Sequence, residues 1–348
     1  MSVRDEFNAA IRDRILIKDG PYGTMIQSYR LDEKDYRGDL PVTRDQKGNN
    51  DLLNLTRPDI IREIAGKYIG AGSEILATNT FNANTISQAD YACEHLVGDI
   101  NREGARLLKG VIDAAHAKDG RRRFLVGALG PTNKTLSLSP NVNDPGFREV
   151  DYDQVKGVYR EQIDALVEGG AEIVLIETVF DTLNAKAAAH AAMEAGDALG
   201  QDLPIMMSMT LTDLSGRNLS GHTVEAFWHS IRHVKPLTIG LNCSFGATEL
   251  RPYVQVLSAI ADCPIMVYPN AGLPNELGQY DEAAETTGRL VGEWIDTGFI
   301  NAVGGCCGTT PAHIAAMAAA ASAKPPRAVP HVAPAMRLSG LEAFTLAA

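Results

Sequence analysis

The sequence has no excess of basic residues. Its 348 residues include 32 lysines and arginines against 43 aspartates and glutamates, which gives a formal net charge of -11. Proteins that bind nucleic acids neutralise phosphates with clustered cations. No stripe of basic residues is present in this chain. We therefore expect no nucleic-acid partner.

Long apolar runs are also missing. The longest fall far short of the roughly 20 residues that a membrane-spanning helix needs, and the first residues, MSVRDE, have no signal-peptide pattern. We expect a cytoplasmic protein with no membrane contact. In a reducing compartment, the five cysteines do not predict a disulfide framework. Some of them are instead candidates for metal binding or catalysis.

Short apolar runs, each turning polar at its C-terminal end, alternate with helical patterns along the chain. Continuous apolar runs are typical of parallel strands that are buried on both faces. The runs occupy residues 15–20, 74–81, 124–131, 173–178, 205–210, 237–243, 265–270 and 300–306. The helical patterns occupy residues 58–71, about 84–117, 152–170, 182–199, 223–234, 247–261, 281–298 and 311–322.

Eight such units predict an α/β fold, a (β/α)8 TIM barrel over residues 1–325 followed by a Pro-rich tail over residues 326–348. A doubly wound sheet is the alternative. That fold usually carries a glycine-rich G-x-G-x-x-G turn after its first strand. The turn is absent here, which favours the barrel.

Two adjacent cysteines, Cys306 and Cys307, lie between glycines at the end of the eighth predicted strand. Neighbouring cysteines rarely bridge each other and more often face one metal ion. Cys243 ends the sixth predicted strand, so a barrel would place all three thiols on its C-terminal rim. Three thiolates with a fourth position open predict a catalytic zinc site. The alternative is that they pack as small hydrophobic residues.

The remaining cysteines do not fit this site. Cys93 falls inside a predicted helix, and Cys263 precedes the seventh strand, at the opposite face of the barrel. Both are expected to be structural. Three other polar residues reach the same rim as the cysteines. Glu177 would bind an ammonium group or form a salt bridge, Asp19 would bind a ligand or cap a turn, and Asn270 would contact a ligand or satisfy loop amides.

Several motifs carry a resemblance to a known family. They are residues 19–27 (DGPYGTMIQ), 77–81 (ATNTF), 130–133 (GPTN), 177–186 (ETVFDTLNAK), 240–243 (GLNC), 269–275 (PNAGLPN), 304–310 (GGCCGTT) and 337–342 (RLSGLE). The chain resembles, nearly end to end, the homocysteine-binding module of cobalamin-dependent methionine synthases, within the zinc-dependent homocysteine S-methyltransferase family. The segment 337–342 resembles the stretch that leads into the folate module of those enzymes.

The resemblance implies that Cys243, Cys306 and Cys307 bind zinc and that the sulfur of homocysteine takes the open position. It also implies that Glu177 and Asp19 hold the substrate's ammonium, and that Asn270 can occupy the zinc when substrate is absent. One departure is Pro21, where the family has glycine or alanine. Proline has no N–H, so any donor to the substrate carboxylate must come from elsewhere, such as the helix that starts after Thr310.

The methyl donor is expected to lie outside this chain, because the sequence contains no cobalamin-binding Asp-x-His-x-x-Gly motif. The resemblance predicts a split methionine synthase, in which a separate cobalamin- and folate-binding subunit presents methylcobalamin. The alternative is a self-contained enzyme that uses S-methylmethionine or betaine. Betaine recognition favours aromatic side chains, and only 6% of residues are aromatic. A non-catalytic zinc-binding scaffold is a third hypothesis.

Overall fold

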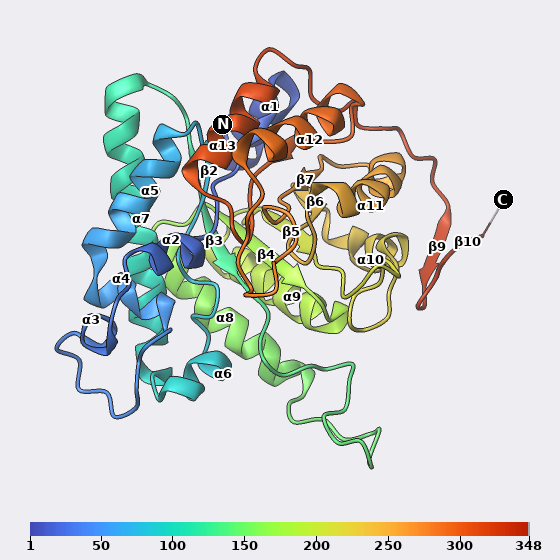
Figure 1. Cartoon of the computed structure of the whole chain (residues 1–348). Coiled ribbons are helices and arrows are strands. Elements are labelled where there is room, and N and C mark those ends of the chain that lie inside the picture. The colour runs from blue at the N-terminus through green and yellow to red at the C-terminus, as the bar shows by residue number, and fades with distance from the viewer. Residues whose placement is uncertain (347–348) are drawn as a thin grey trace.

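The computed structural model describes residues 1–346, and their central feature is a ring of eight parallel strands (Figure 1). Each strand begins within one of the apolar runs that the sequence indicates. Burial of both faces explains why these runs lack polar alternation. The strands are β1 (Leu16–Ile17), β2 (Ile75–Ala77), β3 (Phe124–Leu129), β4 (Ile173–Val179), β5 (Ile205–Met209), β6 (Thr238–Leu241), β7 (Met266–Val267) and β8 (Ala302–Val303).

The ring is closed by short parallel pairings. Strands β2 to β6 are hydrogen-bonded in sequence order, and β1 pairs with β8, which pairs with β7. A bridge from Lys18 to Ile75 joins β1 to β2, and a bridge from Ile239 to Ile265 joins β6 to β7. The predicted TIM-barrel fold is therefore confirmed, with every strand neighbouring the next along the chain.

Helices cover the outside of the ring (Figure 1). The helix after each strand returns the chain to the start of the next one, as parallel pairing requires. The helices are α1 (Val3–Asp13), α2 (Tyr22–Ser28), α3 (Glu33–Arg37), α4 (Leu53–Thr56), α5 (Pro58–Gly70), α6 (Thr85–Gln88), α7 (Val97–Asp119), α8 (Tyr152–Glu168), α9 (Thr182–Leu199), α10 (Val224–Ile231), α11 (Ala247–Ile260), α12 (Ala284–Asp296) and α13 (Pro311–Ala321).

Alternate residues of each strand face two different cores. In β4, Ile173 and Leu175 belong to the cluster inside the barrel, whereas Val174 and Ile176 pack against the surrounding helices. This follows from the two-residue period of a strand. Helix α1 covers the end of the inner cluster that lies opposite the C-terminal rim. Its Phe7 packs edge-on against Phe124, with ring centroids 5.0 Å apart.

One predicted helix is wrong in extent. The pattern over residues 84–117 is broken into α6, two 3-10 turns (Ala89–Tyr91 and Glu94–Leu96) and α7. Cys93 lies between the two turns and not inside a helix. Its buried thiol donates to the side-chain oxygen of Gln46 at 3.3 Å. The helix is broken at Ala92, whose φ of +54° lies in the left-handed region.

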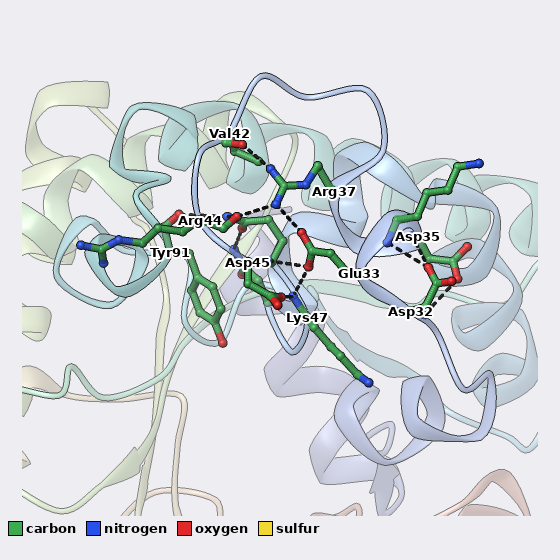
Figure 2. A network of polar contacts seen from close by, with 12 residues as sticks. Asp32, Glu33, Asp35, Arg37, Val42, Arg44, Asp45, Lys47 and Tyr91 are labelled. Carbon is green, nitrogen blue, oxygen red and sulfur yellow. Dashed lines mark hydrogen bonds and ion pairs between the residues drawn. The ribbon is translucent and has the colours of Figure 1, made fainter.

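The loop between α3 and the 3-10 turn Asn50–Leu52 folds around a polar network (Figure 2). The carboxylate of Glu33 accepts the backbone N–H groups of Gln46 and Lys47 at 2.7 and 2.8 Å. The guanidinium of Arg37 pairs with Glu33 and donates to the carbonyls of Val42 and Arg44. These bonds satisfy backbone groups that form neither helix nor strand.

The residues after α13 pack at two places on the barrel. Arg327 is buried at the end opposite the rim, where its guanidinium donates to the carbonyls of Ser258, Ala261 and Cys263. A hairpin of β9 (Met336–Ser339) and β10 (Ala343–Leu346) then lies beside α10 (Figure 1). Among residues 1–346, no helix is both long and apolar enough to cross a membrane.

Candidate metal centre

Three cysteine thiols meet at the C-terminal rim of the barrel. Cys243 follows β6, and Cys306 and Cys307 follow β8. Their sulfur atoms all lie within 4.8 Å of one another, and the sulfurs of Cys243 and Cys307 are 3.8 Å apart. Tetrahedral zinc with bonds to sulfur of about 2.3 Å requires sulfur–sulfur distances of about 3.8 Å. The donor set and its spacing therefore fit zinc, with one position left open.

Glycines allow the two cysteine loops to approach each other. A Cβ on Gly240 would lie 1.6 Å from the carbonyl oxygen of Met266 on the adjacent strand, and one on Gly305 would lie 2.0 Å from the side chain of Thr309. Neither position accepts a side chain without movement of the backbone. The loop is then held by the N–H of Cys306, which donates to the carbonyl of Pro269 at 2.8 Å.

The backbone at Cys243 is strained. Cys243 and Ser244 have φ angles of +62° and +61°, in the left-handed region that side chains other than glycine rarely adopt. The hydroxyl of Ser244 lies 2.8 Å from that of Thr210 and donates to the carbonyl of Leu211. These bonds hold the unusual turn, which directs the Cys243 thiol toward Cys307.

Asn242 links three strand ends beneath the thiols. Its Oδ1 accepts the N–H of Thr178 at 3.0 Å and the hydroxyl of Ser208 at 2.6 Å, and its Nδ2 donates to Thr178 Oγ1 at 2.8 Å. The same Nδ2 lies 4.0 Å from the sulfur of Cys306. Thr178 has φ of +57°, so this amide also stabilises a strained residue at the end of β4.

The three thiols do not ionise independently. Hydrogen bonds from Cys243 and Cys306 lower the pKa of Cys307 to about 3. Hydrogen bonds with Cys243 and Cys307 raise the pKa of Cys306, and burial raises it further. The cluster therefore stabilises one thiolate by donating the protons of the other two. A cation that displaces those protons completes the ionisation of all three sulfurs.

A cluster of charged side chains lies inside the barrel, next to the thiols. Glu177 is 9% exposed, and its Oε2 accepts the hydroxyl of Tyr268 at 2.9 Å. Asp19 is fully buried and accepts the Nζ of Lys18 at 2.9 Å. Burial raises the pKa of both carboxyl groups, and the positive charge of Lys18 partly offsets that rise. The sequence-based predictions did not include Lys18, although a lysine within an apolar strand is an available signal.

Asn270 lies on the loop after β7 and is 2% exposed. Its N–H donates to the carbonyl of Phe245 at 2.9 Å, and its Oδ1 has no hydrogen-bond partner within residues 1–346. Buried acceptors are nearly always satisfied. This oxygen is therefore available to a ligand.

Cys93 and Cys263 stand apart from the cluster of three thiols. Within the described part of the chain, Cys243, Cys306 and Cys307 form the one set of three or more histidine, cysteine or acidic side chains with metal-ligand spacing. Cys263 lies near the buried Arg327, at the end of the barrel opposite the rim. Burial raises its pKa to about 12, so it remains a protonated thiol.

Comparison with known proteins identifies the fold and the family of the chain. The homocysteine methyltransferase MmuM from Escherichia coli superposes in its oxidised form with a TM-score of 0.69 and 20% identity, covering 88% of this chain and 95% of that one. Its metallated form gives a TM-score of 0.68 and 20% identity, over 88% and 96%. The family model described as homocysteine S-methyltransferase matches residues 16–321. The chain therefore belongs to the homocysteine S-methyltransferase family.

Proposed function

We propose that this enzyme methylates the sulfur of homocysteine to give methionine, with Cys243, Cys306 and Cys307 as zinc ligands. The observation that carries the proposal is the convergence of these three thiols within 4.8 Å at the rim of a barrel of this family. An open set of three cysteines has no structural purpose that a closed site would not serve better. The scaffold hypothesis is therefore disfavoured.

Zinc in this site would ionise the thiol of homocysteine at neutral pH and leave it nucleophilic. The protein's own task is to hold that thiol and to orient the rest of the substrate. In the transfer, the homocysteine sulfur forms a bond to the methyl carbon, and the donor leaves with the electron pair of the broken bond. The strained turn at Cys243 and the amide of Asn242 hold the ligand sulfurs in place.

The substrate's amino acid group is proposed to lie over this charged cluster. Glu177 and Asp19 supply negative charge for the ammonium, which pairs favourably where water is excluded. The unpartnered Oδ1 of Asn270 is proposed to accept a hydrogen bond or to reach the metal before substrate enters. These three contacts follow from the resemblance and from the polar groups around the thiols.

We further propose methylcobalamin on a separate subunit as the methyl donor. The proposal is supported by the resemblance to the homocysteine-binding module of cobalamin-dependent methionine synthases, which extends to the tail at residues 337–342. In this arrangement the partner, a cobalamin- and folate-binding subunit, would place the methyl group over the open rim. The alternatives remain S-methylmethionine and betaine acting on this chain alone.

The test is methyl transfer by the purified, zinc-loaded protein. Homocysteine is combined separately with methylcobalamin, S-methylmethionine or betaine, and methionine is measured over time. Turnover with methylcobalamin alone would support the split enzyme, and turnover with a small donor alone would refute it. The Cys306→Ala protein serves as the control and should lose both zinc and activity. Full zinc and full rate in this variant would refute the proposed site.

A further inference from the structure

A buried lysine lies near both acids of the charged cluster. Lys18 is 4% exposed; its Nζ donates to Asp19 Oδ1 at 2.9 Å and lies 4.7 Å from the centroid of the Tyr268 ring. The hydroxyl of Tyr268 donates to Glu177 on the other side. The protein thus places an ammonium of its own beside the carboxylates where the substrate's ammonium is proposed to bind.

The two carboxylates differ in what they can still accept. Asp19 uses Oδ1 for Lys18 and Oδ2 for the N–H of Ala77 at 2.9 Å, and its side chain is 1% exposed. Glu177 uses Oε2 for Tyr268, and within residues 1–346 no group donates to Oε1. A carboxylate oxygen without a donor is the natural partner of an incoming ammonium. Glu177 offers one, and Asp19 does not.

The charges of the three side chains allow one substrate ammonium. Two carboxylates and one lysine leave a net charge of one negative unit, which a single substrate ammonium neutralises. We propose that Lys18 is a positioning and specificity-determining residue that occupies Asp19 and so leaves Glu177 as the carboxylate that binds the ammonium of homocysteine. This inference rests on the proposed function, and it changes the role of Asp19 from direct contact to support of Lys18.

The inference predicts an unusual pattern of rescue. In Asp19→Asn, Lys18 loses the negative charge of its partner and becomes a competitor for Glu177, so homocysteine affinity should fall by about tenfold or more, as for a lost charged hydrogen bond. Adding Lys18→Met removes the competitor, because methionine has similar length and no charge. The double variant should then recover most of the affinity that Asp19→Asn lost.

The experiment measures binding by calorimetry to the zinc-loaded full chain. Homocysteine is compared with 4-mercaptobutanoate, which has the same thiol and carboxylate but lacks the ammonium. The ratio of the homocysteine affinity to the 4-mercaptobutanoate affinity reports the ammonium contact and is insensitive to a general loss of stability. It should be large in the wild type, reduced in Asp19→Asn, restored in Lys18→Met/Asp19→Asn, and near one in Glu177→Gln.

Two outcomes would overturn the role of Lys18. One is a double variant with a ratio no higher than that of Asp19→Asn, which would mean that Asp19 itself contacts the ammonium. The other applies if Asp19→Asn does not fold with zinc. The double variant is then compared with Glu177→Gln, and an affinity ratio near one in both variants would refute the inference. A wild-type protein that binds neither thiol would instead refute the proposed function, and the inference with it.

Discussion

Replacement of Asn242 by alanine tests whether the rim holds its thiols through the residues behind them. The amide of Asn242 joins the ends of β4, β5 and β6 through Thr178 and Ser208, and it approaches the sulfur of Cys306. Alanine removes every one of these bonds. It leaves the partly buried N–H of Thr178 and the buried hydroxyl of Ser208 without their acceptor.

Each buried polar group that loses its partner costs about 1–3 kcal/mol. Two such groups, partly compensated by water in the vacated space, predict a loss of about 3 kcal/mol in the free energy of unfolding. That is a large part of the roughly 5–15 kcal/mol typical of a domain. Loss of a group that orients metal ligands typically weakens metal binding by about 10–100-fold, and we expect the zinc affinity to fall within that range.

Zinc affinity is measured by competition with a chromophoric chelator, and stability by urea unfolding of the metal-free protein. Asn184→Ala is the matched control. Asn184 is also buried and bonds two backbone groups, the N–H of Leu136 and the carbonyl of Lys134, but it contacts none of the thiols. It should lose stability while keeping its zinc affinity. Equal losses of zinc affinity in both variants would refute the reasoning.

Three further predictions concern the same fold. Gly305→Ala should abolish zinc retention in a metal assay, because its Cβ would lie 2.0 Å from Thr309; a variant with wild-type zinc content would contradict this. Replacing both Cys93 and Cys263 with serine should leave one zinc per chain, and a loss of metal would show that the site extends beyond the three thiols. Burial raises the pKa of Asp51 to about 7. Between the ordinary pKa of an aspartate and this raised pKa, the folded state binds a proton that the unfolded state has released. The free energy of unfolding should therefore fall as the pH rises from about 4 to about 7, by up to about 4 kcal/mol. Urea unfolding of Asp51→Asn should show this slope flattened, and an unchanged slope would assign it to another group.

The barrel could be predicted because its strands are buried on both faces. A run such as residues 124–129 is apolar throughout and needs no distant information to be identified as a strand. The thiol cluster could be predicted from the position of the cysteines at the ends of the sixth and eighth strands, because the C-terminal ends of parallel strands share one rim. The network around Glu33 was not predictable in this way. Its partners lie on a loop with no periodic pattern, and they are brought together only in the folded chain.

The left-handed turn at Cys243 was equally hidden from the sequence. Glycine is the usual signal for positive φ, and here cysteine and serine adopt it because hydrogen bonds from neighbouring strand ends hold them there. The sequence placed the cysteine at the strand end correctly. The direction of its thiol, however, depends on contacts between residues that are far apart in the chain.

The register of the strands explains why a lysine is tolerated inside this barrel. Leu16 and Leu175 belong to the apolar inner cluster, and Lys18 and Glu177 each follow two residues later, on the same face of their strands and nearer the rim. The interior therefore changes from apolar to charged within one layer of side chains. An isolated ammonium at this depth would be strongly destabilising, whereas Lys18 has Asp19 and the ring of Tyr268 in the same layer. In the proposed function, the charge of this layer, set by how many acids and lysines it contains, selects the ammonium of the substrate.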